Sequence, residues 1–198
     1  MKTLLLVDIQ NDFLPGGALA VPGGDEIVPL VNTLLPQFDL IVATQDWHPP
    51  NHGSFAANHP GRAPFEQAEL DGLPQTLWPV HCVQNTGGAL FAPGLDTRRI
   101  ARVFPKGMNP NVDSYSGLFD NARRAATGLS EWLKSQNVTS LAVCGLATDY
   151  CVKFTVLDAL HEGFQVTLLT SASRGVNLTL GDTDRAIAEM QTAGAIIQ

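Results

Sequence analysis

Short apolar runs alternate with helical patterns along the whole chain, and this alternation is what most constrains its fold. Six runs have the length and aliphatic character of buried strands; they are 3–7, 40–43, 100–104, 140–144, 166–169 and 195–197. Apolar residues at helical spacing lie between them, in 25–37, 119–135, 150–162 and 182–193. The alternation predicts a single-domain, three-layer α/β/α fold around a six-stranded, mainly parallel sheet.

Composition supports one compact domain over residues 1–198. Hydrophobic residues make up 44% of the chain and charged residues 16%, which is typical of a protein that buries a core. The three cysteines are too few to indicate a disulfide framework. The apolar stretch near the N-terminus, residues 4–7, is too short for a signal sequence or a membrane span. We therefore expect a soluble cytoplasmic protein, and the net charge of −7 argues against nucleic acid or an anionic membrane as a partner.

Reactive side chains are expected where predicted strands end. Asp8 follows the first strand, Asp46 and His48 follow the second, Lys106 follows the third, and Cys151 lies after the fourth. Ligands of open parallel sheets bind beyond the carboxyl ends of the strands. The sequence therefore predicts that an acid, a metal ligand, a base and a nucleophile meet at one edge of the sheet.

Cys151 is the candidate nucleophile, because it falls in the first turn of a predicted helix. Unpaired N–H groups and the helix dipole favour a thiolate there, and the same N–H groups can hold an oxyanion. The alternative is an inert buried cysteine. That alternative is preferred for Cys144, inside a strand. Cys82 follows His81 and is either a packing residue or a ligand.

Asp8 and Lys106 are candidates to assist that thiol. A carboxylate can accept the thiol proton and return it to a leaving amine. A nearby ammonium stabilises both a carboxylate and a thiolate. The alternatives are a turn-forming aspartate and a solvated surface lysine.

Asp46, His48 and His81 form a candidate metal site. On an extended segment, Asp46 and His48 project to the same side, and three N/O ligands leave positions open for water or substrate. Such a set suits one divalent ion, and zinc, iron and manganese stay open. Four of the five histidines, including His52, lie in the irregular segment 47–94, which favours a site there. His52 and Ser54 are extra ligands, neighbours of the ligands or structural residues, and a hydrogen-bonded loop pair is the alternative for Asp46 and His48.

Four aromatic residues lie close in sequence to these groups. They are Phe13, Trp78, Tyr115 and Tyr150. Their rings can line a pocket for a flat ring-shaped substrate, and ordinary core packing is the alternative for each.

Five stretches together resemble the nicotinamidases of the isochorismatase-like cysteine hydrolase family. They are LLLVDIQNDF, ATQDWHPPNHGSF, WPVHCVQNTGGA, VFPKGMNPNVDSYSGLFDN and VCGLATDYCVKFTVLDAL. They span nearly the whole chain in the family's order, and the middle three are the most specific to nicotinamidases.

The resemblance implies a catalytic triad of Asp8, Lys106 and Cys151 and a metal held by Asp46, His48 and His81 and completed by water. It implies a cis peptide before Ala147, with the N–H groups of Ala147 and Cys151 forming an oxyanion hole. It also implies hydrolysis of nicotinamide to nicotinate and ammonia through a thioester, in NAD salvage, with pyrazinamide as a look-alike substrate.

Three other functions stay open at this point. A related carbamoyl or ureido amidohydrolase would share the triad without needing the metal site. An isochorismatase would not need the nucleophilic Cys151, and a catalytically dead binding protein would not need the complete triad. The sequence leaves open the metal identity, the fourth protein ligand and the oligomeric state, a homo-oligomer included.

Overall fold

The computed structural model describes residues 1–198 and contains one six-stranded sheet in the order β5-β2-β1-β6-β7-β8. Its strands are β1 (Thr3–Val7), β2 (Leu40–Asp46), β5 (Arg102–Lys106), β6 (Ser140–Leu146), β7 (Gln165–Arg174) and β8 (Ile196–Ile197). Every neighbouring pair is parallel. The predicted α/β fold with a six-stranded sheet is confirmed, and the sheet is parallel throughout.

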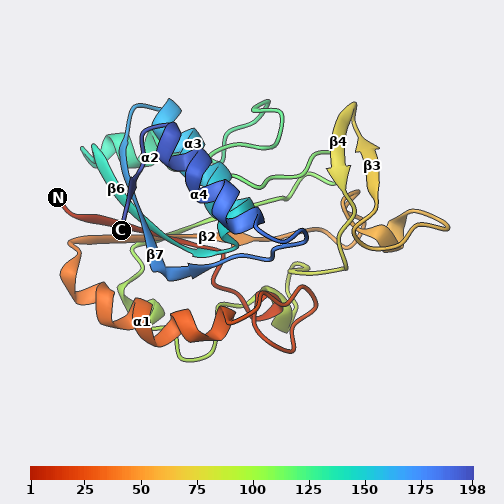
Figure 1. Ribbon diagram of the computed structural model, residues 1–198, viewed down its shortest axis with the longest axis horizontal. Helices are drawn as coiled ribbons and strands as arrows, with labels where there is room; N and C mark the ends of the chain where they lie inside the picture. Colours follow the sequence, from red (N-terminus) through yellow and green to blue (C-terminus); the bar gives the residue numbers. More distant parts are fainter.

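Helices cover both faces of the sheet. They are α1 (Ile27–Leu34), α2 (Leu129–Ser135), α3 (Lys153–His161) and α4 (Asp182–Thr192). Figure 1 shows α1 on one face and the other three helices on the opposite face, which gives the three layers. None of these helices has the length and apolar character needed to cross a membrane.

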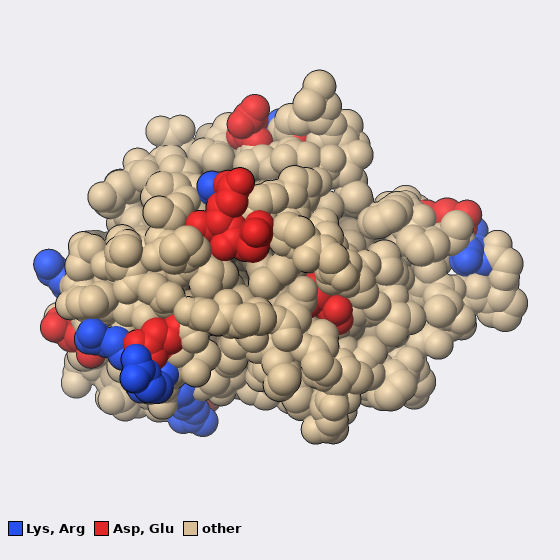
Figure 2. Space-filling view, turned by 90° about the horizontal axis from the view of Figure 1, so that it is seen from below, with Lys and Arg blue, Asp and Glu red and all other residues tan.

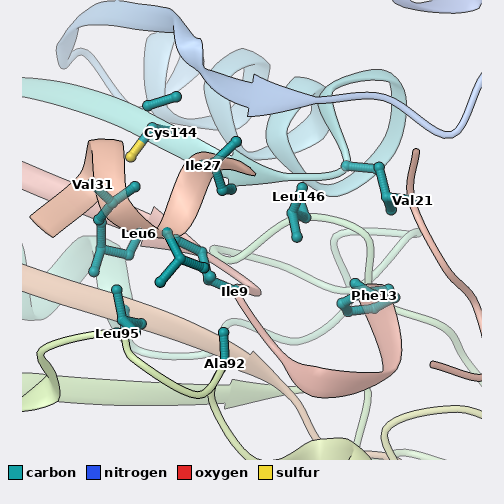
Figure 3. Close-up of a cluster of buried hydrophobic side chains, with 14 of the residues drawn as sticks. Leu6, Ile9, Phe13, Val21, Ile27, Val31, Ala92, Leu95, Cys144 and Leu146 are labelled. Carbon is teal, nitrogen blue, oxygen red and sulfur yellow. The ribbon is translucent and has the colours of Figure 1, made fainter. Parts of the chain in front are cut away.

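Two hydrophobic clusters, one on each side of the sheet, form the core. The central strand β1 contributes to both, because Leu4 and Leu6 belong to one cluster and Leu5 and Val7 to the other. This is the two-residue period of a strand that is buried on both faces. Figure 3 shows the cluster on the α1 side, which extends as far as Phe13.

The predicted helix over 119–135 is wrong for residues 119–128. Only Leu129–Ser135 is helical. The Asp120 carboxylate accepts hydrogen bonds from the backbone N–H groups of Arg124 and Ala125, and Gly128 has a φ of 87°. A side chain that binds nearby backbone groups offers the chain an alternative to a helix, and a left-handed residue interrupts one.

The predicted strand over 100–104 begins and ends two residues too early. The observed β5 runs to Lys106, just as β2 runs to Asp46. Both charged residues are therefore the last residues of strands rather than loop residues, and both side chains are buried. Rigid strand ends hold functional groups more accurately than loops do.

A β-hairpin lies inside the segment that was expected to lack regular structure. It consists of β3 (Gln67–Leu70) and β4 (Leu73–Thr76), and Figure 1 shows it standing apart from the sheet. Asp71 and Gly72, with φ of 51° and 78°, form its turn. This Asp-Gly pair is the sequence signal that would have located it.

Charged side chains are sparse on much of the surface. On the face in Figure 2, most of the area is uncharged, and Lys and Arg lie next to Asp and Glu rather than in a patch of one sign.

Candidate active site

Three buried side chains from the ends of three parallel strands meet at the carboxyl edge of the sheet. Asp8 directly follows β1, Lys106 ends β5, and Cys151 lies in the π-helical turn Thr148–Val152 after β6. Lys106 Nζ lies 2.9 Å from Asp8 Oδ2 and 3.5 Å from Cys151 Sγ. Because these strands are parallel, their carboxyl ends lie at the same edge of the sheet. The sheet therefore brings the three side chains together.

Burial dominates the ionisation of this cluster. It raises the pKa of the Cys151 thiol well above its usual value, although Lys106 opposes the change. It also raises the pKa of Asp8, against the opposing effect of Lys106. Burial therefore favours the thiol over the thiolate that a helix N-terminus would favour, so a base is needed to take the proton when the sulfur reacts.

Lys106 stays charged despite complete burial. Burial alone would lower its pKa, but the carboxylates of Asp46 and Asp8 raise it well above the usual value. The ammonium also donates to the Ser114 carbonyl oxygen at 2.8 Å. One cation therefore compensates two buried carboxylates beside the thiol.

A cavity opens directly onto Cys151. It encloses about 390 Å³ of space, part of it open to solvent. The four aromatic residues singled out from the sequence all line it: Phe13, Trp78, Tyr115 and Tyr150. The Trp78 ring meets the Tyr115 and Tyr150 rings almost perpendicularly, with centroids 6.3 and 4.9 Å away. A mostly apolar cavity with aromatic walls suits a small flat ring.

Ala147 lines the same cavity, next to the reactive turn. The peptide bond between Leu146 and Ala147 is cis, which confirms that expectation. Ala147 and Cys151, the two residues expected to form the oxyanion hole, both line this cavity.

Asp46, His48 and His81 form a second buried cluster on the wall of the cavity. One ligand atom from each lies within 4.8 Å of the others. Asp46 Oδ2 is 3.1 Å from His48 Nε2 and 3.5 Å from His81 Nε2. The structure thus brings the three predicted metal ligands together.

The hydrogen bonds behind these histidines favour binding of a cation. His48 Nδ1 lies 2.8 Å from the Gly107 carbonyl oxygen, and His81 Nδ1 lies 2.8 Å from the Pro79 carbonyl oxygen. A carbonyl oxygen only accepts, so each Nδ1 carries the N–H and each Nε2 offers a lone pair in the neutral ring. Two imidazole lone pairs and a carboxylate oxygen converge, which fits a divalent ion.

His52 and Ser54 lie beside this cluster and bind each other. His52 Nδ1 is 2.7 Å from Ser54 Oγ, and His52 Nε2 is buried with no hydrogen-bond partner. Burial lowers the pKa of His52 to about 4, so its ring is neutral at pH 7. One possible metal-binding atom of His52 also lies within 4.8 Å of such atoms of His48 and Asp113.

Sequence reasoning missed two polar residues of the site. Thr44 donates from Oγ1 to Asp8 Oδ1 at 2.6 Å, and its place on β2, two residues before Asp46, puts it on the same side of that strand. Asp113 lines the cavity. No predicted strand ends near Asp113, so a search for reactive residues at the ends of predicted strands could not find it.

The fold and this constellation define the class of protein: a three-layer α/β/α protein with a buried cysteine, aspartate and lysine at the carboxyl edge of a parallel sheet. The chain belongs to the isochorismatase family, since residues 2–198 match the family described as Isochorismatase domain.

Relatives with known activities cover almost the same length. The chain is 54% identical to the nicotinamidase of Escherichia coli over 99% of this chain and 93% of that protein. A solved nicotinamidase and pyrazinamidase from Acinetobacter baumanii has a TM-score of 0.96 and 43% identity, covering 99% of this chain and 94% of that one. A pyrazinamidase of Pyrococcus horikoshii, solved in complex with zinc, has a TM-score of 0.81 and 40% identity, covering 100% and 98%.

Proposed function

We propose that this protein is a nicotinamidase, which hydrolyses nicotinamide to nicotinate and ammonia in NAD salvage. The observation that carries the proposal is the contact of Lys106 Nζ with both Asp8 and Cys151, because Cys151 lines an aromatic cavity. The nicotinamidases of similar sequence and structure support nicotinamide as the substrate. Pyrazinamide, an amide on a similar flat ring, is a second substrate, and the cytoplasm is the place of action.

The first half of the reaction forms a thioester. Asp8 takes the proton of the Cys151 thiol, and the sulfur forms a bond with the amide carbon. The N–H groups of Ala147 and Cys151 hold the oxyanion. Asp8 then gives its proton to the amide nitrogen as the C–N bond breaks, so that ammonia leaves and the acyl group stays on sulfur.

The second half restores the thiol. Asp8 takes a proton from a water molecule, whose oxygen bonds to the thioester carbon. The C–S bond breaks, the proton returns from Asp8 to sulfur, and the acid leaves as nicotinate after giving its carboxyl proton to solvent. Lys106 keeps its charge in both halves and compensates Asp8 whenever that carboxylate is ionised.

Asp46, His48 and His81 would hold a single divalent ion, zinc in our proposal. When bound, such an ion would supply a Lewis-acid site for the ring nitrogen of the substrate and so orient the ring. Phe13, Trp78, Tyr115 and Tyr150 enclose the ring and exclude water from it.

Ammonia release measured by a coupled assay tests this function. Nicotinamide and pyrazinamide are compared with a carbamoyl amide, each with and without chelator, on protein of known metal content. We expect turnover of both ring amides and a large loss with chelator that added zinc restores. Turnover of the carbamoyl compound alone would instead identify the related carbamoyl amidohydrolase.

A further inference from the structure

Gln75 is the one buried residue of the two strands of the β3–β4 hairpin. Its neighbours on the hairpin are half-buried or exposed, whereas Gln75 is only 2% exposed. Glutamine is mostly found at protein surfaces, and a buried amide needs partners for its N–H groups. The burial of Gln75 therefore indicates a specific role for its side chain.

The Gln75 amide binds two residues that line the cavity. Nε2 lies 2.9 Å from Asp113 Oδ2 and 3.2 Å from Tyr115 Oη, and both partners line the space in front of Cys151. Nε2 also lies 2.7 Å from the Thr76 carbonyl oxygen. The amide nitrogen carries two hydrogens, so the Asp113 carboxylate, the Tyr115 hydroxyl and the Thr76 carbonyl oxygen share them.

The contact with Tyr115 reaches a second aromatic wall. Tyr115 Oη also accepts a hydrogen bond from Trp78 Nε1 at 3.2 Å. The Gln75 and Trp78 donors thus meet at one oxygen, and the two rings lie nearly perpendicular, at 88°. Since Tyr115 fixes the position of the Trp78 indole, a displaced hydroxyl would disturb two walls at once.

Other contacts hold the hairpin to the body of the protein without Gln75. Asp71 at its turn forms an ion pair with Arg124, and Leu70 packs so closely on Gly53 that a Cβ there would meet its side chain. The two strands also pair over four residues each. Replacing the Gln75 amide therefore removes the hydrogen bonds to the cavity while the hairpin stays in place.

We propose that Gln75 is a positioning residue that fixes the Tyr115 hydroxyl and the Asp113 carboxylate, and through them the walls that hold the substrate ring. This inference rests on the proposed function, because it assigns the fit of the nicotinamide ring to these walls. The hairpin, although it stands apart from the sheet (Figure 1), thereby contributes to substrate binding without touching the reacting atoms.

Gln75→Met tests the proposal, with Gln67→Met as its matched control. Gln67 is a glutamine on the same hairpin, but it is exposed and binds Thr76 Oγ1 at 3.0 Å. We expect Gln75→Met to raise KM for nicotinamide about tenfold, the change that loss of one hydrogen bond typically produces, with a smaller change in kcat. Gln67→Met leaves KM unchanged. An equal KM for the two variants would overturn the proposal.

A double-mutant cycle separates positioning from general destabilisation. Tyr115→Phe removes one of the two oxygens through which Gln75 acts, so the double variant should raise KM by less than the product of the two single effects. An increase in KM equal to the product of the two single increases would contradict the proposal. Gln75→Ala, which cannot over-pack the site, is a second variant without the donor and must also raise KM. Circular dichroism establishes that each variant is folded.

Failure of the proposed function can be told apart from failure of this inference. If the wild-type protein releases no ammonia from nicotinamide, the function is wrong. In that case the same variants are compared by the Kd for nicotinate, measured by calorimetry, and an unchanged Kd in Gln75→Met overturns the role of Gln75.

Discussion

Lys106 Nζ lies 2.7 Å from Asp46 Oδ1, while the other oxygen of the same carboxylate faces His48 and His81. Asp46 is therefore shared between the proposed triad and the proposed metal site. A displacement of the Asp46 carboxylate would therefore disturb Lys106 of the triad and the histidines of the metal site together. Burial would raise the pKa of Asp46, but His48 and Lys106 hold it well below its usual value.

Removal of the Lys106 charge is predicted to destabilise the protein strongly. Lys106→Met leaves Asp8 and Asp46 buried without their shared cation, which we expect to cost about 3–5 kcal/mol in the free energy of unfolding. Urea denaturation measures it. Lys134→Met is the control, because Lys134 makes an ion pair of 2.7 Å with Glu162 at the surface, and such pairs contribute at most about 1 kcal/mol. Equal losses in the two variants would contradict this account.

Gly107→Ala is predicted to weaken metal binding. A Cβ at Gly107 would lie 2.4 Å from His48 Cε1 and 2.6 Å from His48 Nδ1, at a φ of 66°. The His48 ring would have to move, so zinc affinity measured by chelator competition should fall by at least about tenfold, which is typical when the hydrogen bond behind a metal-binding histidine is disturbed.

Gly128→Ala separates the displacement of His48 from backbone strain. Gly128 also has a positive φ, of 87°, but a Cβ there would meet nothing within 4 Å. The control should lose about 1 kcal/mol of stability and keep its zinc affinity. The interpretation fails if both variants bind zinc equally well.

The acid limb of the pH–rate profile is predicted to follow Asp8. Burial raises the pKa of Asp8, and the base works only when ionised. kcat/KM should therefore fall, as the pH is lowered, at a pH above the ordinary aspartate pKa of about 3.9. An acid limb at or below that value would exclude Asp8 as the titrating group.

Thr44→Val is predicted to move that limb further. The Thr44 hydroxyl donates to Asp8 Oδ1 at 2.6 Å and lowers the pKa of Asp8. Without this bond the pKa rises, so the limb should shift to higher pH. A shift to lower pH, or none, would show that Thr44 does not act on the base.

The sequence was sufficient to predict the sheet and several of the side chains that meet at its carboxyl edge, because both follow from local patterns. Aliphatic runs located β1 and β6, and the residues at strand ends located Asp8, Asp46 and Lys106. The sheet then brings these side chains together without further information.

The parts that escaped prediction depend on long-range contacts or on local side-chain bonds that hydrophobic spacing does not reveal. In the β3–β4 hairpin the one buried strand residue is a polar one, Gln75, and its partners Asp113 and Tyr115 lie far away in the sequence. Residues 119–128 have helical spacing, but the Asp120 side chain binds the backbone there instead. The resting state of Cys151 also depends on burial, which outweighs the expected effect of a helix N-terminus.

Ammonia release from nicotinamide by Cys151→Ala is the most direct test of the central claim, with Cys144→Ala as the matched control. Cys144 is also buried but lies in β6 and packs in the core on the α1 side. The covalent mechanism predicts that Cys151→Ala loses at least about 10³-fold in kcat, while Cys144→Ala keeps its activity. Near-normal turnover by folded, metal-loaded Cys151→Ala would contradict the mechanism.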